Sequence, residues 1–333
     1  MKTYPACSII IPARNEEHNL PQLLTSLNQQ EIKPTEILVV DDHSTDKTAH
    51  VARSFGARVI EARELPPGWV GKAWACHQGA QQAEGEVFIF LDADITMESD
   101  GLKKIFHTFL LQRGVVSLQP YHRVKKPYEN LSAFFNIMIM AGMNAFTLLG
   151  KRWPPTGLFG PSLITSRQDY FQVGGHEKVK NRILEDLFLG QEYLHHDIPL
   201  RLYGGKGCLS FRMYPNGIGE LIQGWSKAFA TGASHSSPLV LILTVLWIAG
   251  SVISTTMLIR ALVDLNVFEG SLWLSIYAGY AVQYSWIFKR LGTFSYWTSL
   301  FFPIPLSFFF YVFGKSLFMK LFQKKVIWKD RGI

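Results

Sequence analysis

Short β-rich runs alternate with amphipathic helical segments through the first 120 residues, and this alternation constrains the fold more than any other feature. The leucines at positions 20, 23, 24 and 27 recur at helical spacing between the first two runs. Strands alternating with helices at this pace predict a mostly parallel, doubly wound α/β sheet. The predicted strands are 8–12, 36–40, 58–60, 87–91 and 115–119.

Hydrophobic residues are distributed unevenly along the 333-residue chain. They make up 48% of it and give a mean hydropathy of +0.10, and they dominate the segment from Pro238 to Phe322. The preceding residues have the composition of a globular domain. We therefore expect an α/β domain over 1–235 and a membrane domain with two or three hydrophobic segments over 236–333.

The apolar segments predict a multi-pass topology. Two spans are expected at 239–263 and 272–288, and the loop between them carries Asp264 and Glu269 but no lysine or arginine. The loop after the second span carries Lys289-Arg290, so the positive-inside rule places the amino-terminal domain in the cytoplasm. No secretory signal is recognised near the start, which agrees with this orientation.

Two further apolar stretches leave alternatives open. Residues 296–318 contain Pro303 and Pro305, and they form either a third span or a re-entrant or interfacial segment broken at the prolines. The re-entrant form is preferred because it keeps the basic carboxyl tail inside. Residues 131–150 are expected to form a helix in the membrane interface or packed on the domain, rather than a span.

The net charge of +7 and the pI of about 9.2 do not indicate a nucleic-acid-binding protein. No basic stripe with interleaved aromatic residues is present. Positive charges instead flank the apolar segments, which suits anionic lipid headgroups. Cys7, Cys76 and Cys208 have no metal-binding spacing and are typical of a reducing compartment.

Acidic residues follow two of the predicted strands. Asp41-Asp42 comes after the second strand, and Asp92-Ala93-Asp94 comes after the fourth. Ligands bind at the carboxyl ends of strands in such sheets. Carboxylate oxygens suit Mg²⁺ or Mn²⁺, which neutralises a diphosphate, so Asp92 and Asp94 are candidate metal ligands.

Two other segments carry candidate chemistry. Lys72 precedes a predicted helix and could compensate the charge of a leaving diphosphate. Asp186, beside Glu185, is a candidate general base. Both acids also suit the positive end of a helix, a structural role that does not exclude the catalytic one.

Three segments in this order and spacing resemble the family 2 glycosyltransferases: 8–17 (SIIIPARNEE), 39–48 (VVDDHSTDKT) and 91–94 (LDAD). The resemblance runs from about Ser8 to Lys227. It implies the GT-A fold and inverting transfer from a nucleoside diphosphate sugar, with a Mn²⁺ or Mg²⁺ ion.

Site residues follow from the same resemblance. The first-strand loop and the second acid of the Asp-Asp pair would line the nucleoside pocket, Asp94 would be the metal ligand, and Asp92 would lie near ribose or metal. Asp186 would be the base, although Leu184 stands where the family has threonine. The donor-binding residues expected are Pro12, Arg14, Glu16, Asp42, Lys72 and Asp92.

The acceptor side departs from the family pattern. Gly160 lies in a segment that resembles the acceptor-side strand, but residues 223–227 read QGWSK where membrane-bound members have Gln-x-x-Arg-Trp. Trp225 would either stack on a sugar or acceptor or anchor the chain at the membrane, and Lys227 could replace the missing arginine near the diphosphate. This departure favours transfer of a single sugar over polymer synthesis.

Within the family, the sequence looks most like bacterial glycosyltransferases of carotenoid acids, which implies a UDP-sugar donor, UDP-glucose above all, and a lipid carboxylate acceptor. Such an acceptor is already ionised, so Asp186 would have no proton to remove. Hopanoid or polyprenyl-phosphate acceptors remain alternatives. A non-catalytic nucleotide-sugar-binding protein is disfavoured by the intact acids, and the location implied is the bacterial cell membrane.

Overall fold

The computed structural model describes residues 4–145, 153–182, 184–232, 237–321, 327–328 and 331–332. The chain forms two compact units. Unit 1 comprises Met1–Tyr121 and Lys151–Arg212, and unit 2 comprises His122–Gly150 and Met213–Ile333. This division differs from the boundary expected near residue 235, because two segments on its amino-terminal side pack with the carboxyl-terminal helices.

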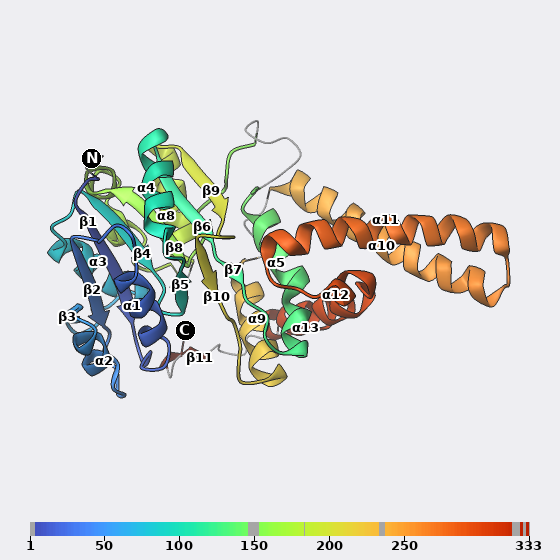
Figure 1. The fold of residues 1–333 in the computed structure, drawn as a ribbon, viewed down its shortest axis with the longest axis horizontal. Helices are drawn as coiled ribbons and strands as arrows, with labels where there is room; N and C mark the ends of the chain where they lie inside the picture. The colour runs from blue at the N-terminus through green and yellow to red at the C-terminus, as the bar shows by residue number, and fades with distance from the viewer. Residues whose placement is uncertain are drawn as a thin grey trace. The chain divides into compact units, whose positions relative to one another are not determined.

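Unit 1 is built on a seven-stranded sheet with the order β3-β2-β1-β4-β8-β6-β9. Neighbouring strands are parallel except β8, which runs antiparallel to β4 and β6. All five predicted strands are confirmed, and so is the mostly parallel sheet. The strands of unit 1 (Figure 1) are β1 (Cys7–Ala13), β2 (Glu36–Asp41), β3 (Arg58–Glu61), β4 (Val87–Leu91), β5 (Ile95–Met97), β6 (Val115–Gln119), β8 (Ser162–Ser166), β9 (Leu200–Gly204) and β10 (Leu209–Phe211).

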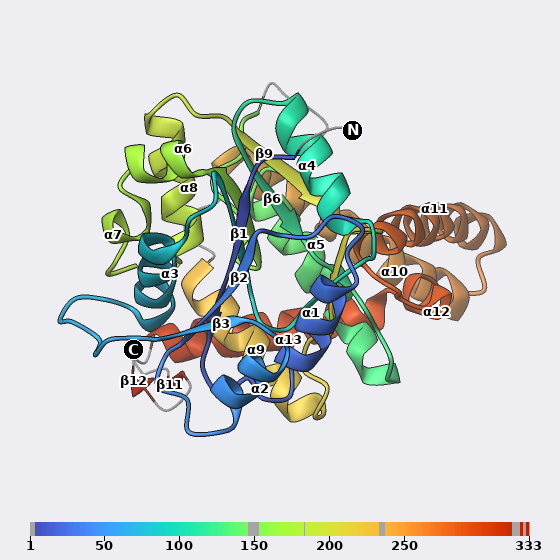
Figure 2. The ribbon, with the colours of Figure 1, turned by 60° about the vertical axis from the view of Figure 1, so that its left-hand side comes forward.

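Helices cover both faces of this sheet, as a doubly wound fold requires. Figure 2 shows α3, α6, α7 and α8 on one side and α1 and α4 on the other. The helices of unit 1 are α1 (Leu20–Asn28), α2 (Thr48–Ser54), α3 (Gly71–Gln82), α4 (Gly101–Leu111), α6 (Arg167–Gln172), α7 (Gly175–Lys178) and α8 (Glu185–His195).

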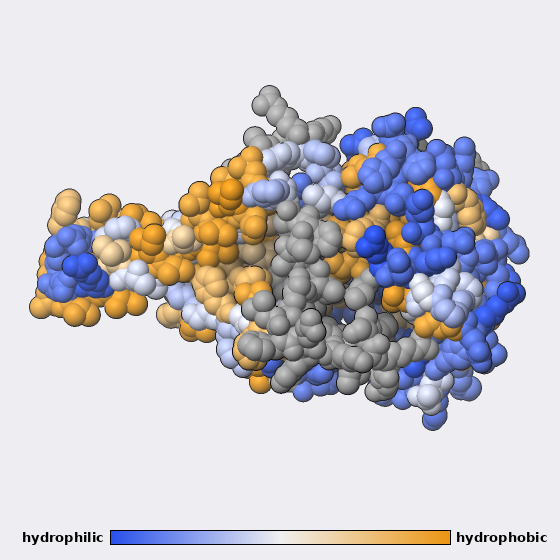
Figure 3. Space-filling model, turned by 180° about the vertical axis from the view of Figure 1, so that it is seen from behind, coloured by the Kyte–Doolittle hydropathy of each residue, from blue (hydrophilic) through white to orange (hydrophobic). Residues whose placement is uncertain are grey.

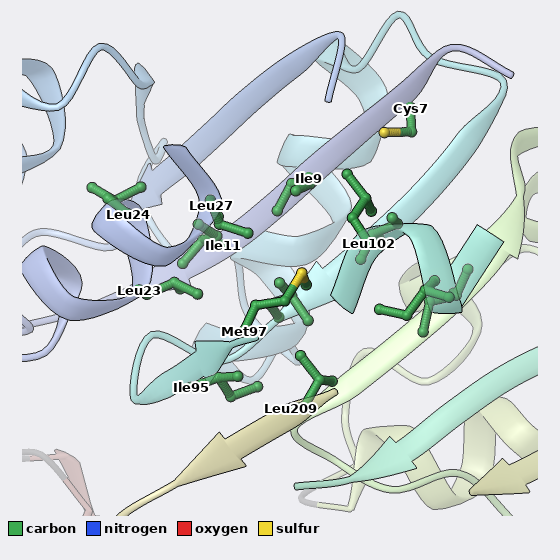
Figure 4. Packing of buried hydrophobic residues seen from close by; sticks show 14 of the residues in the cluster. Cys7, Ile9, Ile11, Leu23, Leu24, Leu27, Ile95, Met97, Leu102 and Leu209 are labelled. Carbon is green, nitrogen blue, oxygen red and sulfur yellow. The ribbon is translucent and has the colours of Figure 1, made fainter. Parts of the chain in front are cut away.

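Successive side chains of β1 point to opposite faces of the sheet, so they belong to two hydrophobic cores, one on each face. Ile9 and Ile11 pack with the leucines of α1, as Figure 4 shows, whereas Ile10 faces the other core with α3 and α8. Helix α3 lies close to the sheet at Gly79, where a Cβ atom would come within 2.5 Å of the Ile10 side chain. Both faces are therefore closed, which explains the apolar runs at the centres of β1, β2 and β4.

Unit 2 is helical and has its own aromatic core. Phe134 and Phe135 of α5 pack with Phe288 and Phe302 from the carboxyl-terminal segments. The apolar stretch 131–150 thus contributes a ten-residue helix to this core, and residues 146–150 lie outside the described part. The chain enters unit 2 at β7 (Tyr121–His122), and the unit's elements are η1 (Pro127–Ser132), α5 (Ala133–Gly142), α9 (Ile218–Gly232), α10 (Pro238–Val263), α11 (Val267–Leu291), α12 (Tyr296–Leu300), α13 (Pro303–Leu321), β11 (Ile327–Trp328) and β12 (Arg331–Gly332).

Helices α10 and α11 pack against each other and present an apolar surface. Figure 3 shows hydrophobic residues over this pair and a hydrophilic end. Asp264 follows α10 directly, and Glu269 lies in the first turn of α11. Among the described residues, α10 is the one helix that is long and apolar enough to cross a membrane, with a mean hydropathy of 2.1. The span expected at 272–288 lies within α11, and its insertion stays a prediction.

The apolar stretch 296–318, for which a third span and a segment broken at the prolines were both left open, is interrupted before Pro303. Helix α12 ends at Leu300 and α13 begins at Pro303, so 296–318 is not one continuous helix. A proline at the first helical position suits the start of α13, because its missing N–H would have no partner there. The side of the membrane on which this segment ends stays a prediction.

Candidate active site

The carboxyl ends of β1 and β2 bring the expected nucleoside-side residues together. Pro12 pairs with Val40 in the parallel ladder. The Arg14 guanidinium lies 3.6 Å from the Asp42 carboxylate and donates to the Asp42 carbonyl at 3.2 Å. Asp42 is 4% exposed, so this acid is buried beside a cation and has carboxylate oxygens able to accept hydrogen bonds from a base or ribose.

The loop after β1 is fixed by hydrogen bonds to the loop after β2. The Asn15 backbone N–H donates to Ser44 Oγ at 2.9 Å, and the Thr45 N–H donates to Asn15 Oδ1 at 2.8 Å. The Glu16 N–H donates to Thr48 Oγ1 at 2.8 Å, at the start of α2. The two loops expected to hold the nucleoside are therefore one connected structure in unit 1.

Lys72 is the centre of an ion network that joins three separate elements. It lies in the first turn of α3, and its ammonium is 3.0 Å from Asp92, 3.3 Å from Glu185 and 3.2 Å from Asp186. It also donates to the carbonyl of Gly160 at 3.0 Å. Residues from three segments that are distant from one another in the sequence thus meet at one cation.

The charge states within this network depend on one another. Burial by itself would lower the pKa of Lys72, but the negative charges of Asp186, Asp92 and Glu185 hold it well above its ordinary value. Burial raises the pKa of Asp186 well above its ordinary value, and Lys72 opposes that shift. Lys72 is therefore charged at neutral pH, and its charge favours the ionised form of Asp186.

Asp94 follows Asp92 by two residues and lies where negative charge accumulates. Its side chain reaches solvent, yet desolvation by the surrounding protein, and after it the charges of Asp92 and Glu16, raise the pKa of Asp94 to about 7. Crowded carboxylates of this kind are stabilised by a bound cation. Two carboxylates with open surroundings fit an ion that takes its other ligands from water and phosphate.

Any metal ion at this site would depend on Asp92 and Asp94. In the part of the chain that the structure describes, there is no group of three histidine, cysteine, aspartate or glutamate residues that could hold a metal ion. Mg²⁺ is commonly bound through one or two carboxylates together with substrate phosphates. Asp92 and Asp94 could therefore hold a divalent ion together with a diphosphate. An all-protein metal cage does not fit these residues.

Gly160 has no side chain, and this lets its backbone lie close to Asp186 and Lys72. A Cβ atom at this position would lie 3.3 Å from Asp186 Oδ2 and 3.9 Å from Lys72 Nζ. The residue was expected on the acceptor or diphosphate side, and its carbonyl contacts the cation that contacts Asp186. Any larger residue here would crowd the carboxylate.

Trp225 does not occupy either position expected for it. It is 1% exposed in the core of unit 2, stacks on Phe135 with ring centroids 4.7 Å apart, and donates from Nε1 to Ser132 Oγ at 3.1 Å. A side chain packed in this way is available neither to a sugar nor to the membrane interface. The prediction was wrong because local spacing does not show which face of α9 is buried. The side chain of Lys227 lies outside the described residues.

Sequence reasoning missed the third acid of the network. Glu185 was noted only as the neighbour of Asp186, yet its carboxylate is 7% exposed and contacts Lys72 directly. Two adjacent acids at a helix start usually point in different directions, because successive residues on a helix are rotated by about 100°. A lysine able to reach both could not be recognised without the tertiary structure.

The sequence matches the model of the Glycosyl transferase family 2 over residues 8–172. It is 37% identical to the 4,4'-diaponeurosporenoate glycosyltransferase of Staphylococcus aureus strain MRSA252, over 98% of this chain and 88% of that protein. The protein of the same name from strain USA300 is 36% identical over the same shares.

Among solved structures, glucosyl-3-phosphoglycerate synthase from Mycobacterium tuberculosis, crystallised with Mn²⁺, UDP and glucosyl-3-phosphoglycerate, gives a TM-score of 0.47 at 19% identity. That match covers 70% of this chain and 80% of the other. TarS of S. aureus gives a TM-score of 0.46 at 20% identity, covering 68% of this chain and 40% of its own.

Proposed function

Because this chain belongs to the family 2 glycosyltransferases, we propose that it transfers a hexose, glucose, from a UDP-sugar to the carboxylate of a carotenoid acid at a membrane surface. The observation that supports this acceptor is the 37% identity to a 4,4'-diaponeurosporenoate glycosyltransferase over 98% of the chain. Identity over nearly the whole length includes the apolar unit as well as the glycosyltransferase part. A lipid acceptor suits a protein with such a unit.

The donor would bind at the carboxyl ends of β1, β2 and β4. Buried Asp42, paired with Arg14, would accept hydrogen bonds from the uridine. Pro12, near the end of β1, and Glu16, in the loop that follows, would close the same side. Asp92 and Asp94 would hold the diphosphate through a Mn²⁺ or Mg²⁺ ion, which when bound neutralises the charge of the leaving group. The acids and the cation that support this assignment all lie in unit 1.

The transfer would proceed by attack of an acceptor carboxylate oxygen on C1 of the sugar. The new ester C–O bond forms as the bond from C1 to the diphosphate breaks, and UDP leaves with the electron pair, so the configuration at C1 inverts. A carboxylate nucleophile brings no proton to remove. Asp186, held by Lys72 at 3.2 Å, would then orient the acceptor and stabilise positive charge that develops on the sugar.

Lys72 would connect the two halves of this reaction. Its ammonium lies between Asp92 on the donor side and Asp186 on the acceptor side, at 3.0 and 3.2 Å. A single cation in this position holds the two carboxylates at a fixed separation and opposes the rise in the pKa of Asp186 that burial causes. We therefore assign Lys72 to positioning within the site and, through proximity to Asp92, to charge compensation at the diphosphate.

The test is identification of the labelled product. Membranes containing the full chain are incubated with radiolabelled UDP-glucose, Mn²⁺ and 4,4'-diaponeurosporenoate, and the labelled lipid is treated with mild alkali. A sugar ester releases its label under alkali, whereas a glycoside of a hydroxyl lipid such as a hopanoid keeps it. A label stable to alkali, or one released only by mild acid as from a polyprenyl phosphate, contradicts the carboxylate acceptor.

A further inference from the structure

Unit 2 contains a pocket that the sugar-transfer chemistry does not use. It has a volume of about 500 Å³, and two segments that are about 170 residues apart in the sequence form its walls. We propose that this pocket binds the phosphate of an anionic lipid headgroup. Its polar lining comprises Lys125, Lys126, Asn130, Thr293, Ser295, Trp297 and Thr298.

The chemistry of the lining favours a phosphate group. Lys125 and Lys126 supply two exposed cations, of which Lys126 also donates to the Pro215 carbonyl at 2.8 Å. The Ser295 hydroxyl and the Trp297 indole N–H supply neutral donors. None of the residues that line the pocket is acidic. Charge-assisted hydrogen bonds to phosphate oxygens are stronger than neutral ones.

The walls are fixed before any ligand arrives. Thr293 Oγ1 accepts from the Val124 N–H at 2.7 Å, and the Thr293 N–H donates to the His122 carbonyl at 2.9 Å. Asn130 Oδ1 accepts from the Ser295 N–H at 2.9 Å and from Thr298 Oγ1 at 2.8 Å. A pocket built in this way loses little conformational entropy on binding.

The surroundings of the pocket within unit 2 select a lipid rather than free phosphate. Trp297 lines the pocket and is 67% exposed, and the adjacent Tyr296 is 68% exposed. Lys289, at the end of α11, lies 4.2 Å from the centroid of the Tyr296 ring. Exposed tryptophan and tyrosine beside lysine, at the end of an apolar helix, are typical of the level of lipid headgroups.

The pocket is thus placed where a headgroup phosphate would lie if α10 and α11 enter the bilayer. Exposed apolar side chains cover both helices (Figure 3), and the turn between them lies at the end of the pair away from α12, which carries Trp297 and Thr298 of the pocket (Figure 1). The lipid would hold unit 2 at the surface through a specific contact, in addition to the apolar helices.

The experiment is native mass spectrometry of the full chain, purified in detergent without added sugar donor, with equimolar palmitoyl-oleoyl phosphatidylglycerol and phosphatidylcholine. We expect one phosphatidylglycerol adduct in preference to phosphatidylcholine. Each lysine near an anionic lipid contributes about fivefold in affinity, so Lys125→Gln with Lys126→Gln should weaken the adduct about 25-fold. Lys33→Gln with Lys178→Gln, two exposed lysines of unit 1, removes the same charge and should have no effect.

The single variant Lys125→Gln controls for misfolding of the double variant. Its exposed side chain can be replaced while the hydrogen bond from Lys126 to the Pro215 carbonyl is kept. It should weaken the adduct about fivefold. Equal adducts in the double variant and the wild type would overturn the proposal, as would equal binding of the two lipids. Displacement of the lipid by millimolar inorganic phosphate would assign the pocket to free phosphate and overturn the lipid assignment.

Discussion

The ammonium of Lys72 lies 3.2 Å from the carboxylate of Asp186, although 113 residues separate the two in the chain. The same ammonium is 3.0 Å from Asp92 at the end of β4. One side chain at the start of α3 therefore links the residue expected to act on the acceptor with a residue expected to hold the diphosphate. This link is the basis of the first two predictions.

Replacing Lys72 with methionine should reduce sugar transfer by at least about 100-fold, because removal of one electrostatic stabiliser typically costs that much. The variant keeps the length of the side chain but leaves three carboxylates without their shared cation. Transfer of label from UDP-glucose to lipid measures the effect. Lys178→Met, at an exposed position of α7, serves as the control, and near-normal transfer by the Lys72 variant would contradict the role of the network.

The substitution Asp186→Asn should show whether Asp186 acts as a general base or as a positioning residue. Loss of a general base typically costs about 100-fold to 10,000-fold, whereas a carboxylate acceptor needs no base. We therefore expect a decrease of less than about 100-fold with a carotenoid acid, which is below the usual cost of losing a general base. Glu185→Gln is the matched comparison on the neighbouring acid. A decrease beyond 1,000-fold for Asp186→Asn alone would favour a hydroxyl acceptor.

Asp94→Asn should increase the Mn²⁺ concentration needed for half-maximal UDP-sugar hydrolysis by about tenfold or more, because a metal ligand loses its charge. The change affects one oxygen ligand while Asp92 is retained. Titration of Mn²⁺ into the metal-depleted full chain measures it. Asp100→Asn, an acid at the start of α4, is the control, and identical Mn²⁺ curves for the wild type and the Asp94 variant would exclude the metal role.

Gly160→Ala should impair transfer without unfolding unit 1. The added methyl group would lie 3.3 Å from Asp186 Oδ2, so the carboxylate must shift by a few tenths of an ångström. Misplacement of a reacting group by about 1 Å can cost about 100-fold, and we expect about tenfold here. Circular dichroism verifies folding, and Gly204→Ala, where a Cβ meets no atom within 4 Å, is the control.

His176 should make the protein less stable as the pH falls. Burial lowers its pKa to about 3, and its Nδ1 lies 2.9 Å from the buried Tyr170 hydroxyl. Between pH 6.5 and 3 the unfolded chain binds a proton that the folded chain does not, so the free energy of unfolding decreases as the pH falls. The slope is about 1.4 kcal/mol per pH unit from this residue.

Urea unfolding of the detergent-solubilised chain at pH 7 and pH 5 tests this dependence. The wild type should lose about 2 kcal/mol more than His176→Gln over that interval. His195→Gln, at an exposed position at the end of α8, should behave like the wild type. Equal pH dependence in the wild type and the His176 variant would contradict the assignment.

The sequence by itself determined the strand pattern and the position of the acids that follow two of the strands. Buried parallel strands are continuous apolar runs, so all five could be located, and acids that follow them must lie at the carboxyl edge of the sheet. Asp42 and Asp92 could be placed in this way because their positions depend on local order along the chain. Apolar α10 could be recognised for the same reason, since length and composition suffice.

The tertiary structure alone decided which distant residues meet. The Lys72 ammonium, at the start of α3, lies 3.0 Å from the carbonyl of Gly160 in a loop and 3.3 Å from the carboxylate of Glu185 at the start of α8. No periodic pattern in the sequence predicts these contacts. The same limit explains Trp225, whose burial depends on α5 packing beside α9 in unit 2. Spacing along a chain fixes which face a residue occupies, whereas contact between faces depends on how the elements pack.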